Sequence, residues 1–246
     1  MRALALAALL VVTGCGTSGT GGDGRLTVFA AASLTETFTR LGADFEAANP
    51  GVDVVFNFGG SSALAQQIGQ GAPADVFASA APANMAQVVD AGGTAAEPVT
   101  FAANRLEIAV PAGNPAGITG LADFADADAK IALCAEQVPC GAAAKRAFEA
   151  AGVTARPDTV EQDVKAVLTK VRLGEVDAAL VYRTDVRAAG GEVVGIGFPE
   201  ADRTVNHYPI APLAKARDAA RARAFVDHVR SDRGRAVLAE AGFDAP

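Results

Sequence analysis

The hydrophobic positions after residue 24 form short apolar runs that alternate with segments of helical periodicity. Apolar, β-branched runs between turn residues predict buried strands, and apolar residues spaced three and four apart predict amphipathic helices. The predicted strands are 25–31, 52–58, 74–80, 105–113, 130–134 and 176–186, the last of which runs into a turn. The predicted helices are 33–48, a short helix within 59–73, 82–93, 141–152, 161–175, 214–231 and 232–243.

Glycine and proline mark the ends of these elements. Asn49-Pro50-Gly51 closes the first helix, and Pro82 opens a helix that Gly92 and Gly93 close. Alternation of strands and helices with short loops predicts an α/β fold with mostly parallel sheets. No internal repeat or long linker follows residue 24, so two similar halves predict two lobes joined by more than one chain crossing.

The first residues have the composition of an export signal. Residues 1–14 carry one charge, Arg2, and an apolar stretch too short to span a bilayer. Val12-Thr13-Gly14-Cys15 resembles a bacterial lipobox, which predicts a signal peptide over 1–14 and lipidation of Cys15; a plain secretory signal with another cleavage point is the alternative. Residues 15–25 would then be a lipid anchor and flexible tether on an extracytoplasmic protein.

Charge and length narrow the class of protein. A chain of 246 residues suffices for one large domain or for two lobes of about 100–120 residues. The formal net charge is -7, and loss of 1–14 removes only Arg2 and leaves -8, so nucleic acid is not an expected partner. The arginine-rich segment 215–235 has the spacing of a solvated helix face, with partner docking as the alternative.

Two cysteines remain once Cys15 is assigned to lipid. Cys134 and Cys140 flank a short loop, and an exported protein lies where disulfides persist, so we expect a bridge between them. Two free buried thiols are the alternative. Metal binding by this pair is disfavoured, because His207 and His228 are distant in sequence.

No catalytic motif is present in the sequence. The G-x-S-x-G elbow, the G-x-x-x-x-G-K-[ST] loop and the H-E-x-x-H pair are all absent. His207 and His228 are interpreted as surface or boundary residues, and no nucleophile pairs with a base. We therefore expect neither an enzyme nor a cofactor.

Serines follow two of the predicted strands where helices begin. Ser33 follows strand 25–31, and Ser61 follows strand 52–58. Unpaired N–H groups and the helix dipole make such junctions favourable for anions. Singly, each serine fits a helix cap, and Ser33 with Glu36 matches a capping box. Two serine-marked helix starts in the same half favour a shared anion site.

Four segments in order carry a family resemblance: "TVFAAASLTETF", "GGSSALAQQIGQGAPADVFASA", "VPCGAAAKRAF" and "EQDVKAVLTKVRLGEVDAALVYRTDV". They resemble the periplasmic molybdate-binding proteins of ABC importers, which are type II solute-binding proteins, and the match extends from Leu26 to "AEAGF" near the end. The resemblance implies two hinged lobes, lobe 1 over 26–104, lobe 2 over 105–203, and a return to lobe 1 over 204–246. It also implies a monomer that binds molybdate or tungstate and delivers it to a membrane permease; another oxyanion such as sulfate is the alternative.

By position, the resemblance places the oxyanion donors on five residues. Ser33, Ser61 and Tyr182 would donate through hydroxyl groups, and Cys140 and Val164 through backbone N–H groups. Cys140 stands where the family often has alanine, so a disulfide with Cys134 would tie into the ligand loop.

Two further residues bear on the ligand. Glu36 adds a negative charge near an anion site and must point away from it. An iron-binding relative would want clustered tyrosines, and Tyr182 and Tyr208 are far apart in sequence.

Overall fold

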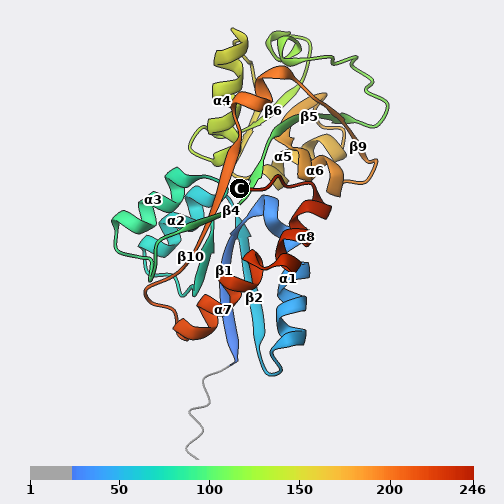
Figure 1. Ribbon diagram of the computed structural model, residues 1–246. Coiled ribbons are helices and arrows are strands. Elements are labelled where there is room, and N and C mark those ends of the chain that lie inside the picture. The colour runs from blue at the N-terminus through green and yellow to red at the C-terminus, as the bar shows by residue number, and fades with distance from the viewer. Residues whose placement is uncertain (1–23) are drawn as a thin grey trace, which may run out of the picture.

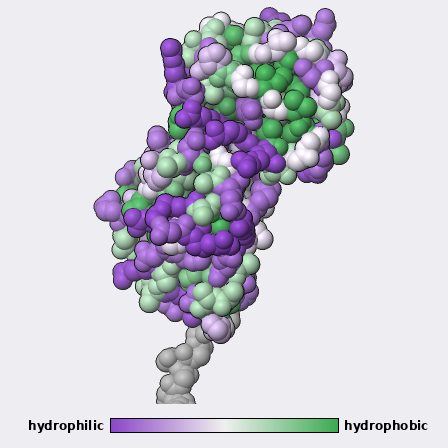
Figure 2. Space-filling model, turned by 45° about the vertical axis from the view of Figure 1, so that its right-hand side comes forward, coloured by the Kyte–Doolittle hydropathy of each residue, from purple (hydrophilic) through white to green (hydrophobic). Residues whose placement is uncertain are grey.

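The computed structural model describes residues 24–246; the predicted signal peptide, Cys15 and nearly all of the tether lie outside them. The described chain forms two lobes, each with a five-stranded sheet flanked by helices (Figure 1). In the space-filling view a narrower waist with many hydrophilic residues separates the lobes, and hydrophobic residues gather on the upper lobe (Figure 2). The predicted two-lobed α/β fold is confirmed.

Lobe 1 is built on a sheet with strand order β2-β1-β3-β10-β4. β1, β2 and β3 are parallel, and β10 is antiparallel to both of its neighbours. The strands are β1 Arg25–Ala31, β2 Asp53–Gly59, β3 Val76–Ala78, β4 Val99–Asn104 and β10 Asn206–Pro212. The helices are the 3₁₀ turn η1 Ala32–Leu34, α1 Thr35–Ala48, α2 Ser61–Gly69, α3 Pro82–Asp90, α7 Ala219–Arg230 and α8 Asp232–Ala241.

Lobe 2 is built on a sheet with strand order β7-β6-β8-β5-β9. β7, β6 and β8 are parallel, and β5 is antiparallel to β8 and β9. The strands are β5 Leu106–Pro111, β6 Ile131–Cys134, β7 Thr159–Glu161, β8 Ala178–Tyr182 and β9 Val193–Ile196. The helices are α4 Pro139–Ala151, α5 Val164–Arg172, α6 Arg183–Ala188 and the 3₁₀ turns η2 Leu121–Ala125 and η3 Pro199–Arg203.

The sheets are mixed rather than mostly parallel, because the chain crosses between the lobes. Arg105 alone separates β4 from β5, and the chain returns through the segment before β10. β5 and β10 therefore begin at the lobe interface, whereas the carboxyl ends of the parallel strands point towards it. For this reason β5 and β10 are antiparallel to their neighbours. The carboxyl ends of the parallel strands of the two lobes face each other across the interface.

Several short or proline-containing strands escape the sequence pattern. β10 contains Pro209 and Pro212, and its register with β4 shifts between Tyr208 and Pro209. Proline lacks the N–H of a regular ladder, so a strand with two prolines is not recognised from its sequence. β4, β7 and β9 were also missed.

Amphipathic helices cover the sheets of both lobes. In lobe 1 the ring of Phe38 in α1 packs near Phe101 of β4 and Phe225 of α7, with centroid separations of 5.7 and 6.2 Å. No helix within residues 24–246 combines the length and apolar character that crossing a membrane requires.

Candidate functional site

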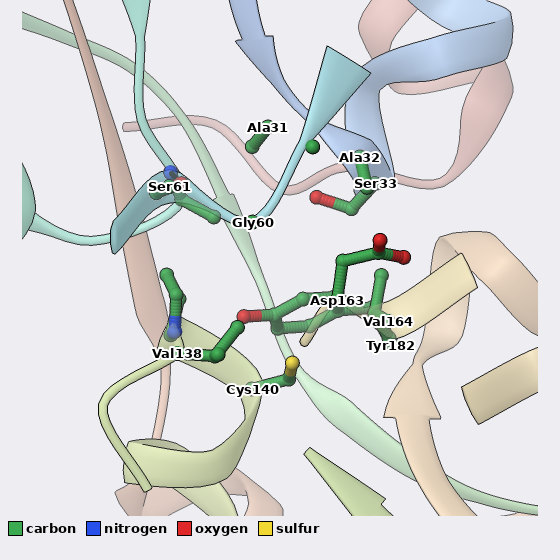
Figure 3. A pocket seen from close by; sticks show the side chains of 13 residues that line it. Ala31, Ala32, Ser33, Gly60, Ser61, Val138, Cys140, Asp163, Val164 and Tyr182 are labelled. Atoms are coloured by element: carbon green, nitrogen blue, oxygen red, sulfur yellow. Dashed lines mark hydrogen bonds between the residues drawn. The ribbon is translucent and has the colours of Figure 1, made fainter. Parts of the chain in front are cut away.

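A pocket lies between the lobes where the carboxyl ends of the strands face each other (Figure 3). All five residues predicted as oxyanion donors line it: Ser33, Ser61, Cys140, Val164 and Tyr182. The volume of this cavity is only about 10 Å³. That is about the room of a single water molecule and far below the several hundred Å³ of pockets for organic ligands, and the lining comes from both lobes.

Ser33 lies inside the 3₁₀ turn η1, between β1 and α1, and is almost fully buried. Its Oγ is 2.9 Å from the hydroxyl of Tyr208. Nδ2 of Asn104 in turn donates to the Tyr208 hydroxyl at 3.5 Å. Burial raises the pKa of Tyr208, so the phenol keeps its proton, and either hydroxyl can donate in its hydrogen bond with Ser33. When Tyr208 donates, the hydroxyl hydrogen of Ser33 is available to the pocket.

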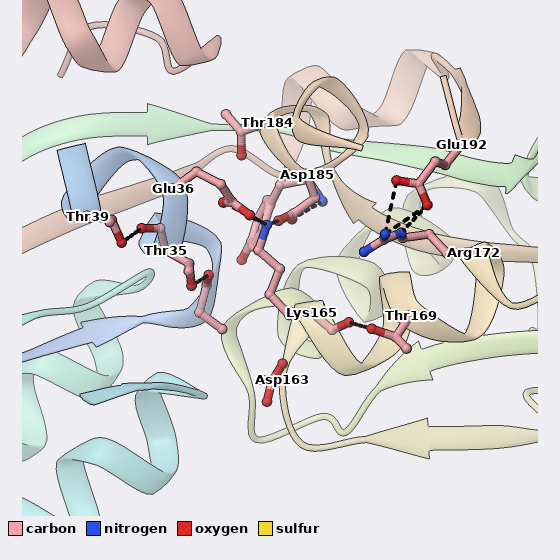
Figure 4. Close-up of polar contacts among 12 residues, drawn as sticks. Thr35, Glu36, Thr39, Asp163, Lys165, Thr169, Arg172, Thr184, Asp185 and Glu192 are labelled. Carbon is pink, nitrogen blue, oxygen red and sulfur yellow. Dashed lines mark hydrogen bonds and ion pairs between the residues drawn. The ribbon is translucent and has the colours of Figure 1, made fainter. Parts of the chain in front are cut away.

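The predicted capping box at Ser33 is wrong. Neither η1 nor α1 has a side-chain cap, because the intervening 3₁₀ turn puts Ser33 inside the first turn instead of before it. The Glu36 carboxylate bonds instead to Nζ of Lys165 in α5, at 2.8 and 2.9 Å (Figure 4). Glu36 therefore leaves the backbone N–H of Ser33 alone.

Ser61 is the first residue of α2, and only 1% of it is exposed. Its Oγ accepts a hydrogen bond from the backbone N–H of Ala80 at 3.0 Å, which leaves the hydroxyl hydrogen free to donate. Gly60 precedes it and lies against lobe 2. A Cβ at Gly60 would lie 2.2 Å from the carbonyl oxygen of Gln162 in lobe 2, so only glycine permits this contact.

Two helix starts of lobe 2 face the serines. Cys140 is the second residue of α4 and Val164 the first residue of α5, positions whose N–H groups have no acceptor within the helix. Oδ1 of Asp163 caps α5 by accepting from Ala166 N at 2.9 Å. The structure bonds Cys140 to Cys134 through a disulfide, which ties the start of α4 to the end of β6.

Tyr182 ends β8, and its side chain extends into the pocket (Figure 3). It is almost fully buried, yet its hydroxyl has no hydrogen-bond partner among the described residues. Burial raises the pKa of Tyr182 well above its usual value, so the group remains a neutral donor. A buried hydroxyl without a partner costs about 1–3 kcal/mol, which an acceptor in the pocket would recover.

A family model described as bacterial extracellular solute-binding protein matches residues 26–244. This chain belongs to that family. Molybdate-binding protein ModA of Mycobacterium tuberculosis strain H37Rv is 44% identical to this solute-binding protein over 227 residues, which cover 92% of this chain and 87% of that protein. The resemblance drawn from the sequence motifs is thus confirmed.

Two solved structures share the fold of this solute-binding protein. The periplasmic molybdate-binding protein of Azotobacter vinelandii has a TM-score of 0.76 at 20% identity and covers 90% of this chain and 99% of its own. The sulfate-binding protein SubI of Mycobacterium tuberculosis H37Rv also has a TM-score of 0.76, at 18% identity, and covers 90% and 86%. At these identities the likeness establishes the fold alone.

The relatives are solute-binding proteins rather than enzymes, which supports a binding role for this chain. One argument against an iron site does not survive. The fold brings Tyr182 and Tyr208 together, with ring centroids 6.0 Å apart, despite their distance in sequence. Residues 24–246 contain no cluster of three or more histidine, cysteine or acidic residues suited to a metal ion.

Several residues that shape the site were missed from the sequence. Tyr208 and Asn104 orient Ser33, although Tyr208 lies in a strand that its prolines conceal. The positions of Gly60 and Asp163 in the sequence could have indicated a role at the site, since each directly precedes a predicted donor at a helix start. Lys165 carried no signal, because its partners Glu36 and Asp185 are distant in sequence and Glu36 lies in the other lobe.

Proposed function

We propose that this solute-binding protein captures molybdate, or tungstate, between its lobes. The observation that carries the proposal is the donor set of the pocket. The hydroxyls of Ser33, Ser61 and Tyr182 meet there with N–H groups at helix starts of both lobes. Among the described residues, no lysine, arginine or histidine lines the pocket, and the one carboxylate there, Asp163, caps α5.

Molybdate matches such a donor set. It is a dianion with four acceptor oxygens and, at neutral pH, no proton to donate. Hydrogen bonds to a charged acceptor contribute about 1.5–3 kcal/mol each, so several neutral donors can replace a cationic side chain. Three helix starts add the positive ends of their dipoles. Tungstate has the same charge and nearly the same size, so it should bind comparably.

The relatives favour molybdate over the sulfate alternative. The 44% identical mycobacterial relative is a molybdate-binding protein, whereas the sulfate-binding neighbour shares only the fold. Sulfate offers the same four oxygens on a smaller tetrahedron, so it remains the second candidate.

We further propose that the protein is a lipoprotein monomer that delivers its ligand to an ABC permease. The family's extracellular location and the lipobox-like residues before Cys15 support this arrangement. The same proposal assigns 26–104 and 204–246 to lobe 1 and 105–203 to lobe 2. The hinge lies where the chain crosses, so opening the lobes would release the ligand.

Calorimetric titration tests the ligand. The chain without residues 1–23 should bind molybdate and tungstate with similar affinity, and sulfate and phosphate much more weakly. Tight binding of sulfate or phosphate with no molybdate heat would refute the assignment.

A further inference from the structure

Three charged side chains form a cluster that spans both lobes beside the pocket (Figure 4). Nζ of Lys165 in α5 lies 2.8 and 2.9 Å from the two carboxylate oxygens of Glu36 in α1. The same Nζ lies 3.0 Å from Oδ1 of Asp185 in α6. None of the three lines the donor pocket itself, so oxyanion coordination does not explain them.

The cluster is nevertheless attached to the pocket through the chain. Each member lies within three residues of a pocket residue, in the pairs Ser33 with Glu36, Val164 with Lys165, and Tyr182 with Asp185. Oδ2 of Asp185 also accepts a hydrogen bond from the backbone N–H of Tyr182 at 3.1 Å. Movement of α1 against α5 would therefore change the cluster and the pocket together.

The two ion pairs of Lys165 differ in whether they depend on closure of the lobes. Asp185 is fully buried in the same lobe, so it holds the ammonium whether the lobes are open or closed. Glu36 belongs to the other lobe, and 55% of its side chain is exposed. Only the Glu36 contact depends on closure.

Charge explains why such a pair suits this place. An unpaired Glu36 three residues from Ser33 would repel a dianion in the pocket. Pairing with Lys165 neutralises that charge. Burial tends to lower the pKa of Lys165, but Asp185 and Glu36 outweigh it and raise the pKa, so the ammonium stays charged.

We propose that Glu36 and Lys165 form an inter-lobe latch that stabilises the closed protein and slows ligand release, with Asp185 positioning Lys165. Glu36 does not line the pocket, so it acts as a positioning residue. The inference rests on the proposed oxyanion binding, and a measurement without ligand separates the two.

Tyrosine fluorescence provides a local readout of release. The chain has no tryptophan, and its two tyrosines, Tyr182 and Tyr208, both lie at the interface between the lobes. In stopped-flow experiments, the protein is mixed with molybdate at a series of concentrations, and the slope of the observed rate against concentration gives the association rate. The intercept of the same plot gives the release rate.

Glu36→Gln should release molybdate about two- to fivefold faster with little change in association, as expected for loss of a partly exposed ion pair. Glu36→Lys should release it faster still, because it faces Lys165 with a like charge. The difference between Glu36→Gln and the unmodified protein should shrink at about 1 M salt, where charges are screened. A merely structural role would not show this salt dependence.

Asp44→Asn is the matched control. Asp44 lies on the same helix α1 and pairs with Arg233 of α8 at 2.8 Å, entirely within lobe 1. The rate at which Asp44→Asn releases molybdate should equal that of the unmodified protein. Equal release rates for Glu36→Gln and the unmodified protein would overturn the latch.

Small-angle X-ray scattering without ligand separates the two proposals. If molybdate does not bind at all, the proposed function fails, and scattering decides the latch. Glu36→Gln should then show a larger radius of gyration than the unmodified protein, with Asp44→Asn unchanged. Equal radii for all three would refute the latch.

Discussion

The serine hydroxyls of the pocket are oriented by second groups before any ligand arrives. The hydroxyl of Tyr208 is hydrogen-bonded to Ser33 Oγ, and the N–H of Ala80 donates to Ser61 Oγ. Because Ser61 Oγ accepts from Ala80 and Ser33 Oγ can accept from Tyr208, both serine hydroxyl hydrogens can be directed to the pocket. Donors fixed in this way lose little freedom when the ligand binds, which raises affinity.

Ser33→Ala should weaken molybdate binding about 10- to 100-fold, because it removes one hydrogen bond to a charged acceptor. Ser62→Ala is the control, since Ser62 is also buried at the start of α2 but does not line the pocket. Calorimetry measures both affinities, and thermal unfolding measures stability. An unchanged affinity in Ser33→Ala would make Ser33 only a structural partner of Tyr208.

Tyr182→Phe should separate binding from stability. The hydroxyl has no partner among the described residues, so its removal should leave the free energy of unfolding unchanged or slightly higher. Molybdate affinity should fall about tenfold or more, because the ligand loses a donor. A loss of stability without a loss of affinity would contradict the donor role.

At the scale of elements, the site depends on how closely the start of α2 approaches the segment before α5. Gly60 and Gln162 meet there, and both sides carry N–H groups that the ligand would bridge. The backbone of Gly60 has φ -62° and ψ 130°, which any residue adopts. Gly60 is therefore required for the contact between lobes and not for the fold of its own lobe.

Gly60→Ala should weaken molybdate binding about tenfold or more while changing stability little, because its Cβ blocks closure. Gly59→Ala is the matched control. A Cβ at Gly59 would meet only Leu64, at 3.7 Å, an ordinary contact. Scattering with saturating molybdate should show that Gly60→Ala stays more open than Gly59→Ala, and equal compaction of the two variants would refute the steric block.

Most elements were predicted from the sequence, and the sequence itself explains why β7 and β10 were missed. α1, α2, α4 and α5 carry clear apolar periodicity and turn residues at their ends. β10 is interrupted by Pro209, and β7 has three residues, too few to show a pattern. The direction of β10, and hence the mixed sheet of lobe 1, follows from a chain crossing between the lobes that no local pattern encodes.

On the scale of the whole molecule, the C-terminal segment ties the lobes together at the waist. Asp244 pairs with Arg183 at 2.8 Å and with Arg105 at 3.0 Å. Its backbone also forms an antiparallel bridge with Ala103 of β4. Arg183 belongs to lobe 2, and Arg105 stands at the crossing between β4 and β5.

Asp244 should make stability depend on acid pH. Burial tends to raise its pKa, but Arg183 and Arg105 lower it below the usual 3.8. The unfolded chain therefore binds the proton first, so the ion pairs stabilise above that value and are lost as pH falls through the folded pKa. In urea titrations, Asp244→Asn should be about 1 kcal/mol less stable at about pH 6, and this difference should shrink as pH falls below 3.8 and through the folded pKa. A difference independent of pH would contradict this account.

The sequence by itself determined the local features of this protein: the alternation of strands and helices, the serines at helix starts, and the order of motifs that revealed the family. These depend on neighbours along the chain, whose spacing a pattern records. Tertiary structure alone decided that Tyr208 orients Ser33, that Glu36 pairs with Lys165 and that β10 is antiparallel. Each of these joins residues more than 100 positions apart, and only tertiary packing, within lobe 1 or between the lobes, brings such groups within bonding distance.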